Sequence, residues 1–435
     1  MYAGVFAVVF GLAKAHAAFV GHYDLTGTSR FAWSAAYAGL LCLTAYGAGL
    51  PDLPRTRWSM VSASVLAAAM GAAAMSAVQL VVGDALLPRF VVIGAAVLLP
   101  DWFRVCTRLA SGGRTRAEAR DRVVFVGTVE EARTLDLELH GDPERPAVVA
   151  LDVTADEVAP TVAAPQPLVT GCRRAGATVL VLDADAAARP DLIAQAAVLH
   201  AAGTRVRTLA GFYEEWLGKL PVAELERSSL LFDVGELHRS RYGRVKRLVD
   251  LAAALAGVLV LAVLLPFVLV GNRFANRGPL LYRQERVGKG GRRFTILKLR
   301  TMTPTVDGGA GEWTAEDDPR VTRFGRFLRR SHLDELPQVV NVLRGDLSIV
   351  GPRPEQPRYV DELREKLPFY EVRHVVRPGL TGWAQVKYGY AGSEADALEK
   401  LQYEFWYLRH QSLATDLRIL GRTIRSVIGS RGQGR

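Results

Sequence analysis

The sequence predicts a membrane protein with an N-terminal bundle of four transmembrane helices, a cytoplasmic Rossmann-like α/β domain and a mainly α-helical C-terminal domain. Three observations predict this class. The chain of 435 residues is long enough for about three domains of ~150 residues each. Apolar residues make up 49% of the chain and its mean hydropathy is +0.12, yet its net charge is +10. High apolar content beside a basic excess is typical of membrane proteins with basic cytoplasmic parts.

Composition also excludes several other classes of protein. Disordered chains lack apolar residues, which are abundant here. The 41 glycines and 21 prolines follow no period, so a collagen-like or low-complexity chain is excluded. Cys42, Cys106 and Cys172 cannot form a disulfide framework, and their spacing offers no zinc site.

The first predicted part, residues 1–105, contains four apolar blocks. They lie at residues 2–21, 31–50, 61–82 and 85–101. Each block is close to the ~20 residues that cross a hydrocarbon core of ~30 Å. A cleaved signal peptide is the alternative for the first block, but that block has no basic start and contains Lys14. Arg55 and Arg57 lie in the second linker and further arginines follow at 104–122, so the positive-inside rule places both ends of the bundle in the cytoplasm.

The second predicted part, residues 118–225, alternates short apolar runs with helical stretches in a Rossmann-like order. The runs, which read as buried parallel strands, are Val123–Val126, Ala147–Leu151 and Thr178–Leu182. After the first run, Val129 stands where a second glycine would let the backbone approach a pyrophosphate. Glu130 and Glu131 would place negative charge where a helix start should receive phosphate. A scaffold without a dinucleotide is therefore favoured over a dinucleotide site.

A further apolar segment, Leu251–Val270, follows a linker predicted at residues 226–244. Its 20 residues carry no charge and are long enough to span a membrane. Basic residues flank it on both sides, so an ordinary span would send one basic cluster to the outer face. Pro266 would remove a backbone donor and clash with the carbonyl of Ala262, which predicts a break or kink. A re-entrant helical hairpin and a kinked fifth span both stay open on these residues alone.

Residues 273–300 are strongly basic, with nine lysines and arginines against the single acid Glu285. This stretch fits either a face lying on anionic lipid or a site for phosphorylated ligands, and taken alone it favours lipid contact. The turn Gly288–Gly291 could present backbone amides to a phosphate, but it is not a P-loop.

An adjacent acid pair, Asp334 and Glu335, lies between Arg329 and the apolar run Val339–Leu343. Neighbouring arginine favours the ionised carboxylate that a nucleophile or metal ligand needs. Two adjacent acids also allow one to attack while the other holds Mg²⁺ through oxygen. A similar pair at residues 361–362 opens a charged helix instead, so its context is different.

Downstream of the acid pair, Pro352 and Pro354 flank Arg353. Two prolines would fix the backbone on either side of one guanidinium, which suits bidentate phosphate binding. A structural turn with an exposed arginine is the equally weighted alternative.

Six phrases in one order carry a resemblance to a known family: Lys298–Met302, Asp318–Thr322, Leu333–Gln338, Asn341–Ser348, Gly351–Glu355 and Arg377–Val386. Through them, residues 245–428 resemble the bacterial sugar transferase family, the monotopic phosphoglycosyl transferases that begin exopolysaccharide, capsule and O-antigen synthesis. The four spans and the degenerate Rossmann-like domain also resemble the long form of this family. The resemblance implies that residues 245–435 are the catalytic domain and hold a re-entrant membrane helix.

The resemblance also implies a reaction. A sugar 1-phosphate would pass from a UDP-sugar to membrane polyprenyl phosphate, giving a polyprenyl diphosphate-sugar and UMP. In the family the aspartate of the acid pair is the nucleophile and forms a covalent phosphosugar intermediate, while the glutamate helps to bind Mg²⁺. These roles fall on Asp334 and Glu335. Four basic residues match positions of the family's active site and are expected to bind phosphate or uridine diphosphate: Lys298, Arg300, Arg329 and Arg353.

Two positions differ from the family's pattern. Leu265 precedes Pro266 where the family often has serine, and Glu404 precedes the aromatic residues 405–407 where the family commonly has aspartate. Glu404 is expected to contribute to substrate binding.

The implied partners are the UDP-sugar, the polyprenyl phosphate and the membrane; nucleic acid is not expected, and a homodimer is plausible without a visible motif for it. The implied location is the bacterial inner membrane, as a multi-pass protein whose catalytic domain faces the cytoplasm.

The rival enzyme class is a membrane-bound nucleotide-sugar dehydratase or epimerase. Tyr242 and Lys246 have the YxxxK spacing of short-chain dehydrogenases, but no intact glycine fingerprint precedes them. A non-enzymatic assembly role is the alternative for residues 1–225. The identity of the sugar is not encoded in any motif, because sugars differ by hydroxyl contacts that the motifs do not report.

Overall fold

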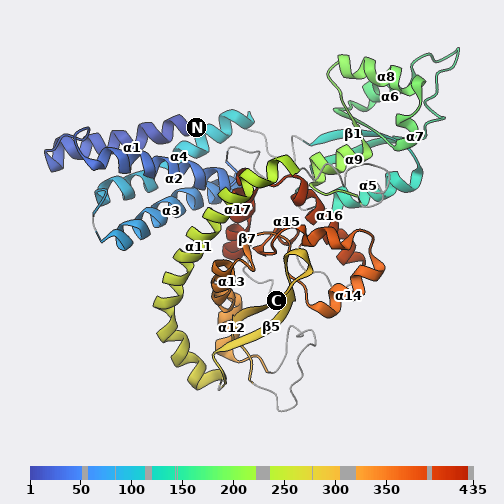
Figure 1. The fold of residues 1–435 in the computed structure, drawn as a ribbon. Coiled ribbons are helices and arrows are strands. Elements are labelled where there is room, and N and C mark those ends of the chain that lie inside the picture. The colour runs from blue at the N-terminus through green and yellow to red at the C-terminus, as the bar shows by residue number, and fades with distance from the viewer. Residues whose placement is uncertain are drawn as a thin grey trace. The chain divides into compact units, whose positions relative to one another are not determined.

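The computed structural model describes residues 1–50, 57–83, 85–112, 120–142, 144, 146–221, 236–276, 278–303, 320–388 and 394–429 (Figure 1). The chain divides into two compact units, Met1–Glu224 and Leu225–Arg435. The finer domain boundaries predicted at residues 105, 118 and 245 stay predictions.

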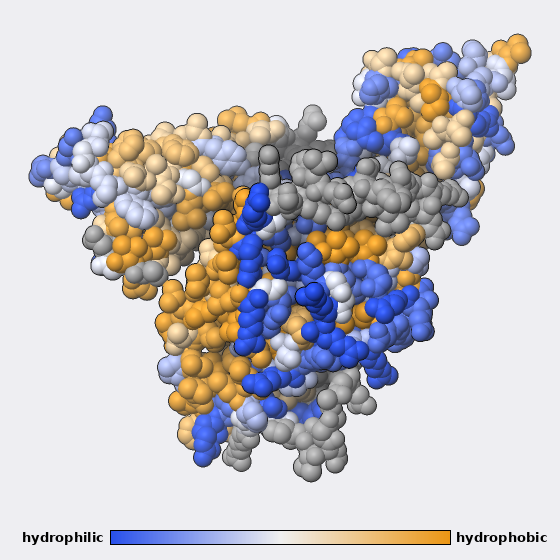
Figure 2. Space-filling model, in the orientation of Figure 1, coloured by the Kyte–Doolittle hydropathy of each residue, from blue (hydrophilic) through white to orange (hydrophobic). Residues whose placement is uncertain are grey.

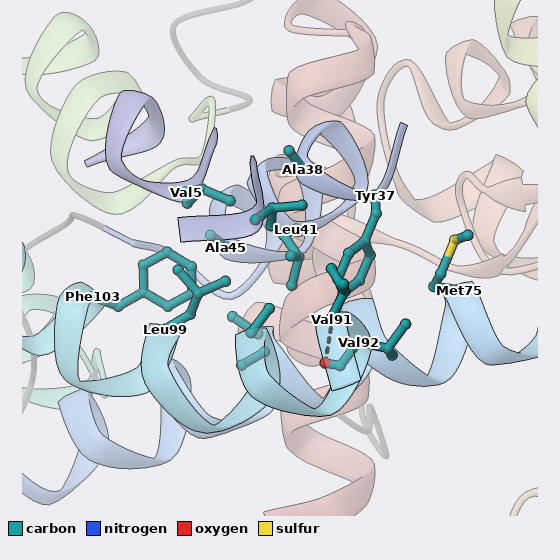
Figure 3. Close-up of a cluster of buried hydrophobic side chains, with 14 of the residues drawn as sticks. Val5, Tyr37, Ala38, Leu41, Ala45, Met75, Val91, Val92, Leu99 and Phe103 are labelled. Carbon is teal, nitrogen blue, oxygen red and sulfur yellow. Dashed lines mark hydrogen bonds between the residues drawn. The ribbon is translucent and has the colours of Figure 1, made fainter. Parts of the chain in front are cut away.

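The first unit begins with four helices that pack together as a bundle. They are α1 (Tyr2–His16, extended by the π-helical turn η1, Ala17–Gly21), α2 (Ser29–Gly47), α3 (Arg57–Val82) and α4 (Arg89–Ser111). Their shared core includes Val5, Leu41 and Leu99, all fully buried (Figure 3). The Tyr37 hydroxyl, also buried there, donates a hydrogen bond to the Val92 carbonyl oxygen at 3.0 Å, so its polar atom is satisfied inside an apolar core.

Four helices in the described residues are long and apolar enough to cross a membrane. They lie at Tyr2–Gly21, Trp58–Leu80, Arg89–Ala110 and Tyr242–Asn276. Helix α2 is not among them, because Arg30, Ser34 and Tyr37 make its 19 residues more polar. The packing of α2 with three apolar helices agrees with a four-helix bundle, but its own crossing stays a prediction.

The rest of the first unit is a parallel α/β layer structure. Its four strands are β1 (Asp121–Val126), β2 (Ala147–Val153), β3 (Val179–Leu182) and β4 (Arg205–Thr208), in the order β2-β1-β3-β4. Three of them fall on the predicted apolar runs. The helices are α5 (Val129–Gly141), α6 (Pro167–Ala175), α7 (Ala184–Ala187), α8 (Pro190–Ala201) and α9 (Leu209–Phe212), followed by the π-helical turn η2 (Tyr213–Leu217).

Alternate residues of the central strands build two separate cores, one on each face of the sheet. Val124 and Leu180 belong to the core beneath α6 and α8, whereas Val123 and Val179 belong to the core beneath α5 and α9. Successive strand side chains point to opposite faces, so a strand covered on both sides must be apolar throughout. This explains why each of these strands appears in the sequence as a continuous apolar run.

The second unit begins with one long helix, α11 (Glu236–Gly271), continued by the π-helical turn η4 (Asn272–Asn276). The helix runs through Pro266 without ending, so the predicted break into a hairpin at that residue is not observed. Pro266 lacks the N–H that would bond to the Ala262 carbonyl, but α11 is buried against the unit on both sides of it, at Ala254 and at Val268, which supports a continuous helix. Residues 236–244 of the predicted linker are the first turns of this helix, and the remainder, up to residue 235, lies outside the described residues.

The remainder of the second unit is mainly helical, with two small sheets. Strands β5 (Leu281–Val287) and β6 (Arg293–Leu299) are antiparallel across the turn η5 (Lys289–Gly291), and β7 (Ser348–Val350) pairs in parallel with β8 (Gly379–Thr381). The helical elements are α12 (Arg323–Arg330), η6 (Leu333–Gln338), α13 (Val339–Arg344), α14 (Pro357–Lys366), η7 (Tyr370–Val375), α15 (Trp383–Lys387), α16 (Glu394–Arg409) and α17 (Leu413–Gly429).

One face of α11 packs on this unit along the length of the helix. The Arg247 guanidinium donates to the carbonyl oxygens of Val342 (2.6 Å) and Leu343 (2.9 Å) at the end of α13. Ala254 is fully buried against α13, and Val268 is buried beside α12. The opposite face is apolar and exposed, and Figure 2 shows it as an orange band along the helix.

Candidate active site

Helix α12 lies directly against the end of β6. The Thr322 hydroxyl accepts a hydrogen bond from the Gly325 N–H at 2.8 Å and so caps the helix. A Cβ at position 325 would lie only 1.9 Å from the Thr301 carbonyl oxygen, so the approach requires glycine. This approach brings Arg329 close enough to donate from Nε to Thr301 Oγ1 at 3.0 Å.

The acid pair follows α12 in the 3₁₀ turn η6. His332 ends the preceding segment in the left-handed conformation (φ 54°), which histidine adopts more readily than most residues. The Glu335 N–H donates to the His332 carbonyl oxygen at 3.3 Å. Pro337 is buried, and α13 behind it packs against Ala254 of α11. The turn at His332 and the core behind Pro337 together fix the position of Asp334 and Glu335.

Glu335 joins three elements that are far apart in the sequence. Its Oε1 atom accepts from Lys298 Nζ on β6 at 2.9 Å and from Arg353 Nη2 on the loop after β7 at 3.3 Å. All three side chains are 20–24% exposed, so the cluster is reachable from solvent. Lys298, Arg353 and the nearby Arg329 outnumber the two carboxylates of the acid pair, so the site keeps one net positive charge, which favours phosphate groups.

The pKa of Asp334 is raised to about 6. Burial raises it most and the adjacent Glu335 adds to this, whereas Lys298 and Arg329 lower it. The prediction that neighbouring arginine sets the direction of the shift is therefore wrong, because lost hydration and the second carboxylate outweigh the two cations. Asp334 is still mostly ionised at pH 7, the form in which a carboxylate can attack.

The loop that carries Arg353 is held in place by hydrogen bonds to its backbone carbonyl oxygens. Each carbonyl oxygen from residue 352 to residue 355 accepts a hydrogen bond, from Gly379 N (2.8 Å), Arg373 Nη2 (2.9 Å), Arg286 Nη1 (3.0 Å) and Val287 N (3.0 Å) in turn. Pro352 and Pro354 also fix φ on either side of Arg353. A fully bonded loop agrees better with rigid presentation of Arg353 than with a turn whose arginine is free in solvent.

Glu404 lies in a buried ion pair. Its oxygens accept from Arg373 Nε and Nη2, both at 2.8 Å, and both side chains are 5% exposed. The carboxylate of Glu404 is thus bonded to Arg373, and its expected contribution to substrate binding stays a prediction. Arg373 also donates to the Tyr370 hydroxyl (2.9 Å) and to the Arg353 carbonyl. Arg373 therefore connects Glu404 to the loop that carries Arg353.

The remaining predicted site residues separate into two groups. Lys298, Arg329 and Arg353 lie beside the acid pair, and their roles there stay predictions. The Arg300 guanidinium instead donates from Nε to the Pro279 carbonyl oxygen at 2.8 Å, and so holds the chain before β5. Sequence reasoning missed Arg373, whose only signal is that it precedes the phrase at 377–386 by four residues.

The acid pair suits a magnesium ion better than a metal that needs protein side chains for all of its ligands. Among the described residues, no group of three or more His, Cys, Asp or Glu side chains could hold a metal. Mg²⁺ commonly takes only one or two carboxylates and completes its shell with water and substrate phosphates. Asp334 and Glu335 offer that smaller set.

Tyr242 and Lys246, the pair with dehydrogenase-like spacing, belong to a polar network that joins α11 to α17. The Tyr242 hydroxyl and Lys246 Nζ both lie 2.5 Å from Asp416 Oδ2, and the Tyr407 hydroxyl donates to Asp416 Oδ1 at 2.9 Å. The Tyr242 hydroxyl donates its proton to Asp416 Oδ2. A tyrosine held in this way stays protonated and cannot act as the base of a dehydrogenase.

Known proteins resemble the chain across its second unit. A family model described as bacterial sugar transferase matches residues 241–430. The chain is 36% identical over 258 residues to a UDP-N-acetylgalactosamine-undecaprenyl-phosphate N-acetylgalactosaminephosphotransferase of Aeromonas hydrophila, covering 55% of this chain and 61% of that protein.

Two UDP-glucose:undecaprenyl-phosphate glucose-1-phosphate transferases are similar as well. The chain is 39% identical to the one from Xanthomonas campestris pv. campestris, over 50% of this chain and 44% of that protein. It is 41% identical to the one from Caulobacter vibrioides, over 45% of this chain and 73% of that protein. The chain thus spans about half the length of the first two relatives and nearly three quarters of the third.

Proposed function

The chain belongs to the bacterial sugar transferase family, and from this premise we propose that it transfers a sugar 1-phosphate from a UDP-sugar to polyprenyl phosphate. The observation that carries the proposal is the Glu335 cluster, in which Lys298 and Arg353 converge on one carboxylate beside Asp334. The names of the similar proteins, which include glucose and N-acetylgalactosamine transferases, indicate the class of sugar nucleotide to try. The polyprenyl diphosphate-sugar formed would begin an exopolysaccharide, capsule or O-antigen.

In the proposed first step, a carboxylate oxygen of Asp334 attacks the sugar-bearing phosphorus of the UDP-sugar. A bond forms between Asp334 and phosphorus, and the bond to the bridging oxygen breaks, so UMP leaves with the electron pair. In the second step an oxygen of polyprenyl phosphate attacks the same phosphorus and the Asp334 carboxylate is released. Dividing the transfer lets UMP depart before the second anionic substrate arrives.

The positive residues of the site would stabilise the charge on the transferring phosphoryl group. Arg353 is presented on a loop whose carbonyls are all bonded, so little reorganisation is needed when phosphate arrives. Lys298 bonds to Glu335, and Lys298 and Arg329 both lie close enough to Asp334 to lower its pKa. Glu335 would be the principal ligand of Mg²⁺, which supplies further neutralisation of the phosphate oxygens.

We propose that the bundle anchors the protein in the bacterial inner membrane with the second unit facing the cytoplasm. We also propose that α11 does not cross that membrane and that both its ends stay on the cytoplasmic side. The supporting observation is that α11 contacts the same folded unit at Arg247 and again at Val268, ~30 Å apart along the helix. Cysteines placed at Arg244 and Arg273 should both react with a reagent on the cytoplasmic side only. Reaction from opposite sides would mean a plain span.

The α/β domain is proposed to be a Rossmann-like scaffold that binds no dinucleotide. Thr128 and Glu131 form a reciprocal capping box, so the Glu131 carboxylate occupies the start of α5 where a pyrophosphate would bind. A Cβ on Gly127 would already lie 2.7 Å from Asp183 Oδ2, which leaves little room at the strand end. This domain and the bundle would then serve assembly or regulation.

The proposal is tested by UMP release from membranes that contain the full chain, polyprenyl phosphate, Mg²⁺ and a panel of UDP-sugars. Asp334→Asn should abolish release, and removal of Mg²⁺ by a chelator should do the same. Asp361→Asn is the matched control, because Asp361 is also followed by glutamate but is exposed on α14. Near-normal turnover by Asp334→Asn would show that the assigned nucleophile is wrong.

A further inference from the structure

The outward face of α12 carries exposed arginines that the proposed reaction does not use. Arg323, Arg326 and Arg330 line an open groove of about 490 Å³ together with Phe327 and Ser331. All three arginines are exposed, and within the described part of the chain no carboxylate pairs with them. Three exposed guanidiniums on one face of a short helix form a surface that attracts anions.

The helix period explains why these arginines share one face. Positions 323, 326 and 330 are spaced by three and four residues, so they lie above one another on the same side. Gly325 and Leu328 are buried on the opposite side, against β6 and α11. The sequence therefore separates a packing face from a charged face within eight residues.

An exposed aromatic cluster joins this charged face to the apolar band of α11. The Phe327 ring lies 6.4 Å from the Phe267 ring of α11, and Phe324 lies 5.8 Å from Phe267. Phe267 and Phe327 are 55% and 49% exposed, and Phe274 just beyond the helix is 74% exposed. Exposed apolar side chains bordered by arginines are typical of a surface that lies in the headgroup region of a bilayer.

We propose that the outward face of α12 is a binding site for the phosphate headgroups of anionic membrane phospholipids. The guanidiniums would bind the phosphates, while Phe267, Phe327 and the apolar face of α11 contact the acyl chains. Guanidinium is suited to phosphate because it donates two parallel hydrogen bonds. The groove is open and the arginines extend ~10 Å along the helix, which fits several lipid headgroups better than one enclosed substrate.

The test places the photocrosslinker p-benzoylphenylalanine at Phe327 of the full chain, in nanodiscs of equimolar phosphatidylglycerol and phosphatidylcholine. Mass spectrometry then identifies the lipid joined to residue 327. Three charge contacts are expected to enrich phosphatidylglycerol on the order of 100-fold over phosphatidylcholine. Substituting all three arginines (Arg323→Gln, Arg326→Gln, Arg330→Gln) should bring the ratio close to one.

The matched control removes three exposed arginines of the α/β domain: Arg133→Gln, Arg173→Gln and Arg174→Gln. It should keep the full enrichment, since it changes net charge equally without touching α12. Equal amounts of the two lipid adducts with the native arginines, or no lipid adduct, would overturn the proposal. Polyprenyl phosphate added at 1% and found as the dominant adduct would overturn the choice of phospholipid. Because crosslinking needs no turnover, these outcomes are separate from failure of the proposed reaction.

Discussion

The buried pair of Arg373 and Glu404 yields a prediction whose size follows from the structure. Glu404→Leu removes two charge-assisted hydrogen bonds of 2.8 Å and leaves the buried Arg373 guanidinium without the carboxylate to which it donates. Burial lowers the pKa of Arg373, but Glu404 and its other neighbours hold it above the ordinary value. The guanidinium therefore stays charged, and breaking a buried pair in this way costs about 3–5 kcal/mol.

A double variant separates the cost of the orphaned charge from the role of the pair. Arg373→Met with Glu404→Leu removes both charges, and replacing a buried pair by apolar side chains is often close to neutral. The double variant should recover most of the lost stability. It also removes the donor to the Arg353 carbonyl, so turnover should stay about tenfold below wild type, as for one lost hydrogen bond to a charged group.

The assay is denaturant unfolding of the full chain in neutral detergent, followed by tryptophan fluorescence, with UMP release measured on the same samples. Trp406 lies two residues from Glu404 and stacks on Trp383 at 4.7 Å, so it reports on this region. A loss below about 1 kcal/mol in Glu404→Leu would refute the claim that the buried guanidinium depends on the Glu404 carboxylate. Normal turnover in the double variant would refute the claim that Arg373 positions Arg353.

Three further predictions concern the site and its supports. The rate of UMP release should fall about tenfold between pH 7 and pH 5, because a nucleophile with a pKa raised to about 6 becomes protonated; an undiminished rate at pH 5 would contradict this. Gly325→Ala should lower the rate of UMP release and cost about 1–3 kcal/mol of stability, since its Cβ would clash with the Thr301 carbonyl oxygen. Gly243→Ala is the control and should change neither the rate nor the stability, because its Cβ would have no atom within 4 Å. Tyr242→Phe should keep the rate of UMP release within a few-fold and cost about 1 kcal/mol of stability; abolished UMP release would contradict the structural role given to Tyr242 in the network with Asp416.

The parts of the fold that were predictable are those in which burial alone sets the residue pattern. The strand at Val123–Val126 is covered on both faces, so it reads as an unbroken apolar run ending at Gly127. Of the break or kink predicted at Pro266, a break is not observed, because α11 packs on the unit both before and after that residue, and this packing is not visible in the local sequence.

The acid pair and the basic residues beside it were predictable because they lie in short sequence phrases that occur in the same order as in the family that the chain resembles. The environment of Glu404 was not. A carboxylate in a sequence looks the same whether it binds a ligand or pairs with an arginine, and Arg373 lies 31 positions away on another element. The pKa direction of Asp334 likewise depends on burial in the folded chain, which the neighbouring arginines in the sequence do not reveal.

The central claim is that Asp334 becomes covalently phosphorylated by the sugar nucleotide before the lipid takes part. The most direct measurement is rapid-quench UMP release from the full chain given Mg²⁺ and a UDP-sugar that supports turnover, with polyprenyl phosphate left out. The mechanism predicts a burst of about one UMP per active site, a sugar-phosphate mass on the peptide containing Asp334, and loss of both in Asp334→Asn. No UMP before polyprenyl phosphate is added would contradict it and indicate direct transfer between the two substrates.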